Sequence, residues 1–424
     1  MTRKMKDSGI EWIGEIPEGW EVSLLKYATR WKSEKGCPDA PVLSLYRDFG
    51  VVPKDSRDDN HNVTSLDTSN YKVVDIGDLV INKMKAWQGS MAVSDYRGIV
   101  SPAYHVCSIT SNKVNKRYLH HLLRNPAYLP EYARLSTGMR IGQWDLGFDD
   151  FKNIPFLIPP LDEQEKIADY LDNGCASLDA ILDKTRASIE EYKKLKQAVI
   201  TQAVTKGVRG EREMKDSGVE WIGKIPAEWS ICPLKRLAAI QTGCTPSKTS
   251  SESFYSSIAG TPWIKPDNLG FSSSIETTAE FLTEEGCSVA RILPSNTVYV
   301  GCIGSRIGNC GYSLIPCACN QQINALIFNA RMYWKYGWYL TIFQEEQYML
   351  LANGNVIQII NSTTQGNISC IVPSISEQKE IVDYLDAKCA EIDRLIAKKE
   401  KMVKELESYK KSLIYEVVTG KREV

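Results

Sequence analysis

The sequence lacks the features that would direct it to a membrane, to the cell exterior or to a disulfide-rich class. No apolar segment follows the basic N-terminal residues, and no apolar run approaches about 18 residues. The twelve cysteines include no Cys-x-x-Cys pair. A loose group of four matches no common zinc spacing: Cys302, Cys310, Cys317 and Cys319. We therefore expect a cytoplasmic protein with free thiols, no metal and no membrane contact.

Patterns typical of catalysis are also missing. There is no Walker A sequence, no His-Glu-x-x-His and no Gly-x-Gly-x-x-Gly after a strand. The adenine-methyltransferase motif that ends in Pro-Pro-Tyr or Pro-Pro-Phe is absent, because Leu161 follows Pro159 and Pro160. The histidines all lie in the first half of the chain, without counterparts in the second: His61, His105, His120 and His121. We therefore expect that this chain is not an enzyme.

A strong excess of positive charge is missing as well. The chain has 51 Lys and Arg residues against 52 Asp and Glu residues, for a net charge of −1. Residues 21–155 contain 18 basic and 15 acidic side chains, and residues 229–370 contain 8 of each. These numbers exclude a chain that coats DNA through its bulk charge. With 43% hydrophobic residues in 424, the chain is long enough for two to four globular domains.

An internal repeat sets the organisation of the chain. Residues 5–17 recur as residues 214–226, with only two differences in the sequence Met-Lys-Asp-Ser-Gly-Ile-Glu-Trp-Ile-Gly-Glu-Ile-Pro. Residues 163–172 recur as 377–386, now at an offset of 214 instead of 209. The chain is therefore a tandem repeat of a unit of about 210 residues, and the second divergent middle is five residues longer.

The closing segment of each repeat has the pattern of a long helix. Each lacks proline and ends near a glycine, Gly207 or Gly420. Asp162 with Glu165 fits a capping box at the first start, and Ser376 fits an N-cap at the second. A narrow apolar stripe runs along the first helix: Ile167, Leu171, Leu178, Ile181, Ile189, Tyr192, Leu195 and Val199. A narrow stripe among charges is typical of a coiled coil, so we expect the two helices to pair.

The two middle segments have a mixed pattern that favours an α/β (α+β) fold. We expect strands at residues 78–81, 99–106, 297–300 and 325–328. We expect helices at residues 116–123 and 334–346. Because the repeated flanks surround divergent centres, the sequence indicates one fold that performs the same type of task on two different targets.

Several motifs resemble those of the specificity subunits of type I restriction-modification systems. The repeated opening segment is similar to the one that begins each half in that family. Residues 77–89 and 98–104 resemble one class of target recognition domain, and residues 263–268, 304–308 and 320–323 resemble another. Residues 159–164 and 373–378 are similar to the entries of the family's separator helices. The resemblance covers essentially the whole chain.

The resemblance implies an architecture of two target recognition domains separated by two antiparallel coiled-coil helices, related by a pseudo-two-fold repeat. The expected parts are an N-terminal repeat segment (1–20), a first recognition domain (21–155), a central helix (156–213), a second repeat segment (214–228), a second recognition domain (229–370) and a C-terminal helix (371–424). Each domain would read one half of a bipartite, asymmetric site in double-stranded DNA, and the helices would set the spacing.

The resemblance also implies partners that perform the chemistry. Two modification subunits would methylate adenine with S-adenosylmethionine, and restriction subunits would translocate and cleave DNA with ATP and Mg²⁺. This chain would bind no cofactor. Two alternatives remain open: a coiled-coil scaffold that binds only protein, and a specificity module of another restriction-modification type.

Candidate DNA-contacting residues are polar or aromatic side chains in loops, because arginine pairs with guanine and amides pair with adenine in the major groove. In the first domain they are Lys83, Lys85, Trp87, Gln88, Arg140, Gln143 and Trp144. In the second domain they are Lys265, Asn268, Ser305, Arg306, Asn355 and Gln358.

Overall fold

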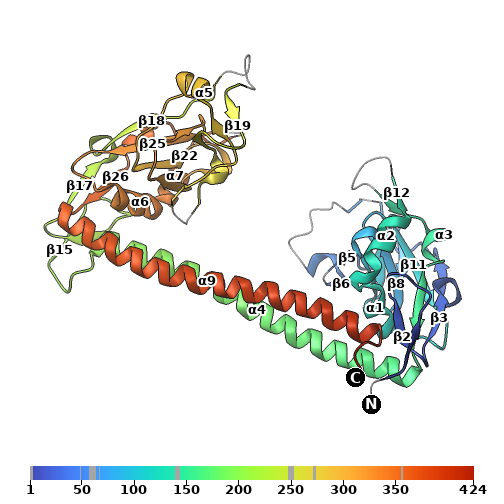
Figure 1. Ribbon diagram of the computed structural model, residues 1–424. Coiled ribbons are helices and arrows are strands. Elements are labelled where there is room, and N and C mark those ends of the chain that lie inside the picture. The colour runs from blue at the N-terminus through green and yellow to red at the C-terminus, as the bar shows by residue number, and fades with distance from the viewer. Residues whose placement is uncertain are drawn as a thin grey trace. The chain divides into compact units, whose positions relative to one another are not determined.

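The computed structural model describes residues 3–47, 49–56, 64–65, 67–138, 144–246, 253–270, 274–354 and 357–424. The chain divides into two compact units. Unit 1 contains residues 1–186 and 400–424, and unit 2 contains residues 187–399. Each unit therefore combines segments from both halves of the sequence repeat (Figure 1).

The repeated opening segments fold into the same small hairpin in both units. In unit 1, β1 (Met5–Asp7) pairs antiparallel with β2 (Glu15–Pro17). In unit 2, β15 (Met214–Asp216) pairs with β16 (Lys224–Pro226) in the same register. The glycines of the connecting turns, Gly9, Gly14, Gly218 and Gly223, all have positive φ, which a residue with a Cβ rarely adopts.

The larger domain of unit 1, which follows the hairpin, is built on an antiparallel sheet with the order β4-β11-β8-β9. Helix α1 lies against β9, where the backbone N–H of Val93 donates to His120 Nδ1. The described elements between the hairpin and the long helix are β3 (Glu21–Leu24), β4 (Thr29–Lys32), β5 (Leu43–Tyr46), β6 (Gly50–Pro53), β7 (Lys72–Val74), β8 (Asp78–Asn82), β9 (Met91–Val93), β10 (Gly98–Val100), β11 (Tyr104–Ile109), α1 (Lys116–Leu123), α2 (Leu129–Leu135), β12 (Ser136–Thr137), β13 (Asp145–Leu146), α3 (Phe148–Phe151) and β14 (Pro155–Ile158).

Unit 2 repeats this sheet with the order β18-β25-β22-β23, although few of its residues match. Helix α6 covers it through ring contacts of Trp334 and Trp338 with Tyr312. The described elements are β17 (Ser230–Pro233), β18 (Ala238–Thr242), β19 (Tyr255–Ser256), β20 (Thr261–Ile264), β21 (Phe281–Leu282), α5 (Glu284–Val289), β22 (Thr297–Gly301), β23 (Cys310–Ser313), β24 (Ala318–Cys319), β25 (Ile323–Phe328), α6 (Trp334–Phe343), α7 (Glu345–Leu351), α8 (Ser362–Gly366) and β26 (Ser369–Val372).

The predicted long helices are α4 (Leu161–Lys206) and α9 (Ile375–Val418). They pair antiparallel inside each unit. In unit 1, Asp179 of α4 binds Lys410 of α9, and Arg186 of α4 binds Glu407 of α9. The α9 residue number falls as the α4 residue number rises, which shows that the helices run in opposite directions. In unit 2, Lys196 of α4 binds Asp393 of α9 at 2.8 Å. The prediction that the two copies pair with each other is confirmed. Among the described residues, no helix is long and apolar enough to cross a membrane.

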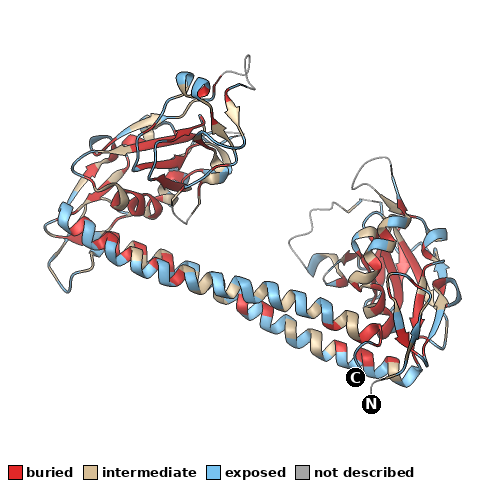
Figure 2. Cartoon of the chain, viewed as in Figure 1, coloured by how far each residue is buried: buried red, intermediate tan, exposed pale blue. Residues whose placement is uncertain are grey.

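Buried residues lie along one side of these helices and on the inner faces of the sheets (Figure 2). Ile167, Leu171 and Ile189 of the predicted stripe are buried. Ile181 and Leu195 are exposed, so their assignment to the seam is wrong. Leu182 and Ile200 are buried instead, and Leu182 lies seven residues before the buried Ile189, as the seam of a heptad repeat requires.

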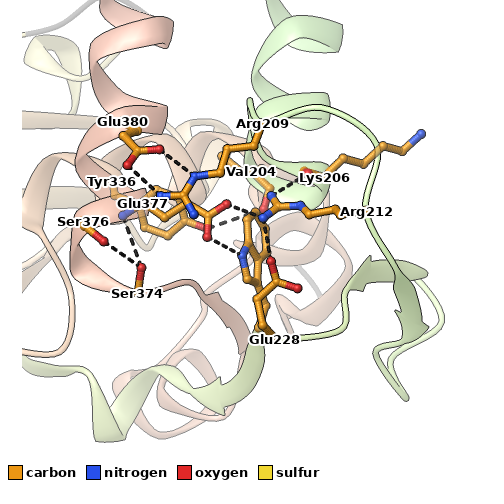
Figure 3. Close-up of polar contacts among 11 residues, drawn as sticks. Val204, Lys206, Arg209, Arg212, Glu228, Tyr336, Ser374, Ser376, Glu377 and Glu380 are labelled. Atoms are coloured by element: carbon orange, nitrogen blue, oxygen red, sulfur yellow. Dashed lines mark hydrogen bonds and ion pairs between the residues drawn. The ribbon is translucent and has the colours of Figure 1, made fainter.

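An arginine, a tryptophan and a glutamate form the same cluster in each unit. In unit 2, the Glu377 carboxylate lies 2.6 Å from Arg212 and accepts a 2.9 Å hydrogen bond from the indole N–H of Trp229 (Figure 3). The equivalent residues of unit 1 are Arg3, Trp20 and Glu163, with distances of 2.6 and 3.0 Å. This Arg–Trp–Glu cluster fastens the opening repeat to the start of a long helix.

The glutamine after each of these glutamates fastens the recognition domain. Gln378 is buried, accepts a hydrogen bond from the backbone N–H of Tyr333 and donates to the carbonyls of Arg331 and Pro373. Gln164 makes the corresponding contacts, with Asn115 N–H and with the carbonyls of Lys113 and Pro159. The repeated Glu-Gln pair is therefore the joint between helix and domain in both units.

The predicted helix ends are partly correct. Gly207 and Gly420 follow the last helical turns with positive φ, as expected of a C-terminal glycine. The N-terminal predictions are wrong. Helix α4 begins at Leu161, so Asp162 already lies inside its first turn, and the Pro160 carbonyl accepts the first bonds. Helix α9 begins at Ile375, and Ser374 instead of Ser376 accepts the N–H of Glu377.

Two predicted elements are interrupted in the structure. Residues 99–106 form the end of β10 and the start of β11, because Pro102 lies between them and cannot donate a ladder hydrogen bond. Residues 334–346 divide at Gln344 into α6 and α7. The strands at 78–81, 297–300 and 325–328 and the helix at 116–123 are confirmed.

Candidate nucleic-acid interface

Unit 2 brings its described candidate residues to one edge of the domain. Lys265 and Asn268 occupy the turn after β20, where Asn268 Oδ1 accepts the backbone N–H of Lys265 at 2.9 Å. Ser305 and Arg306 occupy the turn after β22. The Arg306 guanidinium lies 3.8 Å from Asp267, so the two turns are neighbours.

A third segment joins this edge. The carbonyl of Gln358 accepts the N–H of Gly304 at 2.9 Å, and Ile359 pairs with Ile303. Gly354 precedes this contact with a φ of 146°, and a Cβ there would lie 2.1 Å from the Ile357 carbonyl oxygen. Asn355 lies outside the described residues.

The positive charges of this edge are tied to acids. Lys265 Nζ lies 2.7 Å from Glu280 and 4.8 Å from the centre of the Trp263 ring. Arg306 has Asp267 as its partner. The edge therefore presents amides, a hydroxyl and compensated cations, which is a surface suited to base edges more than to bare phosphates.

Unit 1 gathers its candidates at the turn after β8. Lys83 Nζ lies 3.0 Å from Asp145, and the Trp87 and Trp144 rings meet edge to face at 5.2 Å. Lys85 and Gln88 are exposed on the same turn. The turn at residues 83–88 is therefore in contact with residues 144–145. Arg140 and Gln143 lie outside the described residues.

The two candidate sets occupy corresponding places in the two folds. The turn Ala86–Gln88 follows β8, and the turn Gly304–Arg306 follows β22. Both strands lie inside their sheets, between the equivalent neighbours β11 and β9 or β25 and β23. The motifs that carry the two sets, residues 83–88 and 304–308, do not match each other in sequence.

Sequence reasoning did not include a further amide-rich loop at the edge of unit 2. The N–H of Asn320 donates to the carbonyl of Ile264, next to Lys265, and the Gln322 carbonyl accepts the N–H of Cys302. Gln321 is exposed between them and its amide oxygen contacts the hydroxyl of Thr245. The run Asn320-Gln321-Gln322 was the available signal.

A buried lysine lies beneath the candidate turn of unit 1. Lys72 Nζ donates to the carbonyls of Pro102 and Tyr104 and lies 5.2 Å from the Trp31 ring. Burial, with the nearby charges of Lys83 and Lys35, lowers the pKa of Lys72. Because its hydrogen bonds hold the loop that follows β10, Lys72 supports the site without reaching its surface.

Cys302 and Cys319 of unit 2 have the properties of structural thiols. Burial raises the pKa of Cys302 to about 11 and that of Cys319 to about 12, so both are protonated at neutral pH. Among the described residues, no group of three or more His, Cys, Asp or Glu side chains is placed to hold a metal ion.

Comparison with known proteins identifies the class. The family described as "Type I restriction modification DNA specificity domain" matches residues 32–191 and 226–405, and the chain belongs to this family. It is a type I restriction-modification DNA specificity subunit with two specificity domains.

Relatives of similar length support this assignment. The type I restriction enzyme MjaVIII specificity subunit of Methanocaldococcus jannaschii is 29% identical, over 96% of this chain and 93% of the relative. The putative MjaX specificity subunit of the same organism is 24% identical, over 96% and 95%.

Solved structures support the fold. A chain from a study of complex assembly and conformational transition of the type I R-M system superposes with a TM-score of 0.73, at 16% identity over 96% of this chain and 99% of that one. The HsdS subunit from Thermoanaerobacter tengcongensis gives a TM-score of 0.50 at 16% identity, over 96% and 98%.

Proposed function

We propose that each unit reads one half of a bipartite, asymmetric DNA site and that this chain performs no chemistry itself. One observation carries the proposal: the same turn of the same fold bears Lys85, Trp87 and Gln88 in unit 1 but Ser305 and Arg306 in unit 2. A shared position with different side chains is what two readers of different sequences require.

The chemistry belongs to partner subunits in this proposal. Two modification subunits methylate adenine with S-adenosylmethionine after flipping the base, and restriction subunits use ATP and Mg²⁺. The names of the relatives and of the matching type I complex support such an assembly. The chain itself binds no cofactor, and we expect it to act on DNA in the cytoplasm.

We further propose that the long helices fix the distance between the half-sites. α4 has 46 residues and α9 has 44, and each begins in one unit and ends in the other. At a rise of 1.5 Å per residue, 44 residues measure roughly 66 Å along the helix axis. Continuous helices paired by ion pairs in both units would transmit a defined spacing.

The decisive experiment is methylome sequencing of a host with and without the gene, followed by exchange of one domain. We expect a methylated bipartite motif that disappears with the gene. Replacing residues 229–370 with the domain of a related subunit should change one half of that motif and leave the other half and the gap unchanged. A motif that changes in both halves would refute the assignment of one half-site to each unit.

Two controls separate the competing functions. The purified chain with S-adenosylmethionine should not methylate the motif, and methylation by the chain alone would refute the non-catalytic role. Insertion of one heptad into both helices, with the paired register kept, should lengthen the gap while both half-sites persist. A scaffold that binds only protein would give no sequence preference in the assembled complex.

A further inference from the structure

Exposed apolar side chains flank the candidate interface of unit 2. Met349 is 49% exposed and Leu350 is 75% exposed at the end of α7. Ile357 and Ile359 are 57% and 45% exposed on the segment that pairs with the Ser305 turn. We call Met349, Leu350, Ile357 and Ile359 the apolar rim. Such a concentration of exposed apolar side chains marks an interaction surface more often than a free one.

The rim is continuous with residues proposed to contact DNA. The residues that line a groove of about 440 Å³ include Met349 and Leu350 together with Ser305 and Asn309. Asn353, two residues after the end of α7, joins the α7 part of the rim to Ile359, because its backbone forms reciprocal hydrogen bonds of 2.8 and 3.0 Å with Ile359. The same groove therefore offers amide, hydroxyl and apolar groups together.

The acids of the groove argue for a base instead of a phosphate. Glu345 and Glu346 line it beside Leu350. Carboxylates at this position repel the DNA backbone, whereas the base edges in the major groove carry no net charge. The thymine C5-methyl is the apolar group of that surface, and amides pair with the adenine opposite it.

Among the described residues of unit 1, the helix that follows α1 is α2, and it exposes Arg134, which forms an ion pair with Glu131 at 2.7 Å. Helix α7 of unit 2 instead exposes Met349 and Leu350. The part of the rim on α7 therefore differs in character from α2.

We propose that the apolar rim recognises the methyl group of a thymine in the half-site of unit 2, with Leu350 as the main contact. The inference rests on the proposed function, because it presumes that this edge faces DNA. It assigns a specificity-determining role to side chains that carry no hydrogen-bonding group.

The test uses the chain assembled with its modification subunits. The preferred duplex is selected from random sequences, and each thymine of the unit 2 half-site is replaced in turn by 2′-deoxyuridine, which lacks only the methyl. We expect one replacement to weaken binding about fourfold, the value for burying one methyl-sized group. Leu350→Ala should weaken binding to the thymine duplex by a similar factor and abolish the difference between thymine and deoxyuridine.

Leu314→Ala is the matched control, because Leu314 is also exposed in unit 2 but lies away from the groove. Asn309 of the groove precedes β23, whereas Leu314 follows it. This variant should retain the thymine preference. The inference would be refuted if the half-site contained no thymine, or if every deoxyuridine duplex bound as tightly as the thymine duplex. In either case, sequence-specific binding would still support the proposed function. Loss of modification-subunit binding in Leu350→Ala with the methyl preference intact would show that the rim contacts protein. Failure to select any duplex would contradict the proposed function itself.

Discussion

The Arg–Trp–Glu clusters of the two units predict unequal effects of equal substitutions. In unit 2, the Glu377 side chain is 2% exposed and Arg212 is 14% exposed. In unit 1, the equivalent Glu163 and Arg3 are 21% and 27% exposed. Replacing either arginine by methionine keeps most of the side-chain length and removes the charge. Arg212→Met therefore leaves a buried carboxylate, whereas Arg3→Met leaves one that water can reach.

The magnitude follows from the burial of the remaining charge. Removing one partner of a buried ion pair costs about 3–5 kcal/mol, because the other charge stays desolvated without compensation. For the partly exposed pair, solvent screening reduces the cost to about 1 kcal/mol. The difference between the two variants is about 2–4 kcal/mol, which corresponds to a ratio of roughly 30 to 900 between the populations of their locally opened states.

Hydrogen exchange measures this opening in both units of one molecule. In Arg212→Met, the amides of β15 and β16 should exchange roughly 150 to 5,000 times faster, while those of β1 and β2 remain unchanged. In Arg3→Met, the hairpin of unit 1 should accelerate by about fivefold. Arg209→Met is the control, because its ion pair with Glu380 is half exposed on both sides. Equal acceleration in the two arginine variants would show that burial does not control the strength of the cluster.

Three further predictions concern a histidine, a glutamine and an arginine. Burial lowers the pKa of His120 to about 3, whereas an unfolded imidazole titrates near 6.5, so unit 1 should lose up to about 1.4 kcal/mol per pH unit as the pH falls from 6.5 towards 3. Its melting transition, followed across that range, should lose this slope in His120→Gln. Gln378→Ala should destabilise unit 2 by about 2–4 kcal/mol in denaturant titrations, since it removes the partner of the partly buried N–H of Tyr333 and of two carbonyls. Arg306→Ala should relax specificity at one position of the unit 2 half-site at a cost of about 1–3 kcal/mol, visible in competition binding against single-base variants, whereas a uniform loss across sequences would indicate a phosphate contact.

The repeat and the long helices could be predicted because their signals are local or periodic. Two runs that differ at only two positions fold into hairpins of the same register, and a proline-free apolar stripe ending at Gly207 or Gly420 specifies a helix. The errors lie where tertiary contacts decide. Ile181 and Leu195 have the spacing of seam residues but lie outside the seam. Gln344 divides a helix that periodicity alone would continue, and its side chain donates to the carbonyl of Ser369.

The candidate interface was predictable as a set of loops but not as a surface. Sequence separation hides the contact between Arg306 and Asp267 and the one between Gly304 and Gln358. The role of Glu377 was equally hidden, because its motif repeats in the sequence while its partner Trp229 lies 148 residues away. The exposure of Leu350 could not be predicted from the sequence, because Tyr348 on the same helix is buried. Only the packing of the domain decides which face of the helix is buried and which is exposed.

The near-zero charge of the chain gives a final prediction about its affinity for DNA. Lys83, Lys265 and Arg306 each have an acidic partner, at 3.0, 2.7 and 3.8 Å. If one of these cations contacts a DNA phosphate, it must leave its acidic partner. The net charge that it brings to the DNA is then small, so few counterions are released from the DNA. Because the logarithm of the binding constant falls with the logarithm of salt concentration at about 0.9 per phosphate contact, the isolated chain should show a slope of magnitude below about 4. Titrations by fluorescence anisotropy between low and physiological salt should give a steeper slope once the modification subunits are added. If the chain alone reached the slope of the complex, the phosphate contacts would belong to this subunit, and its compensated cations would have to separate from their acids on binding.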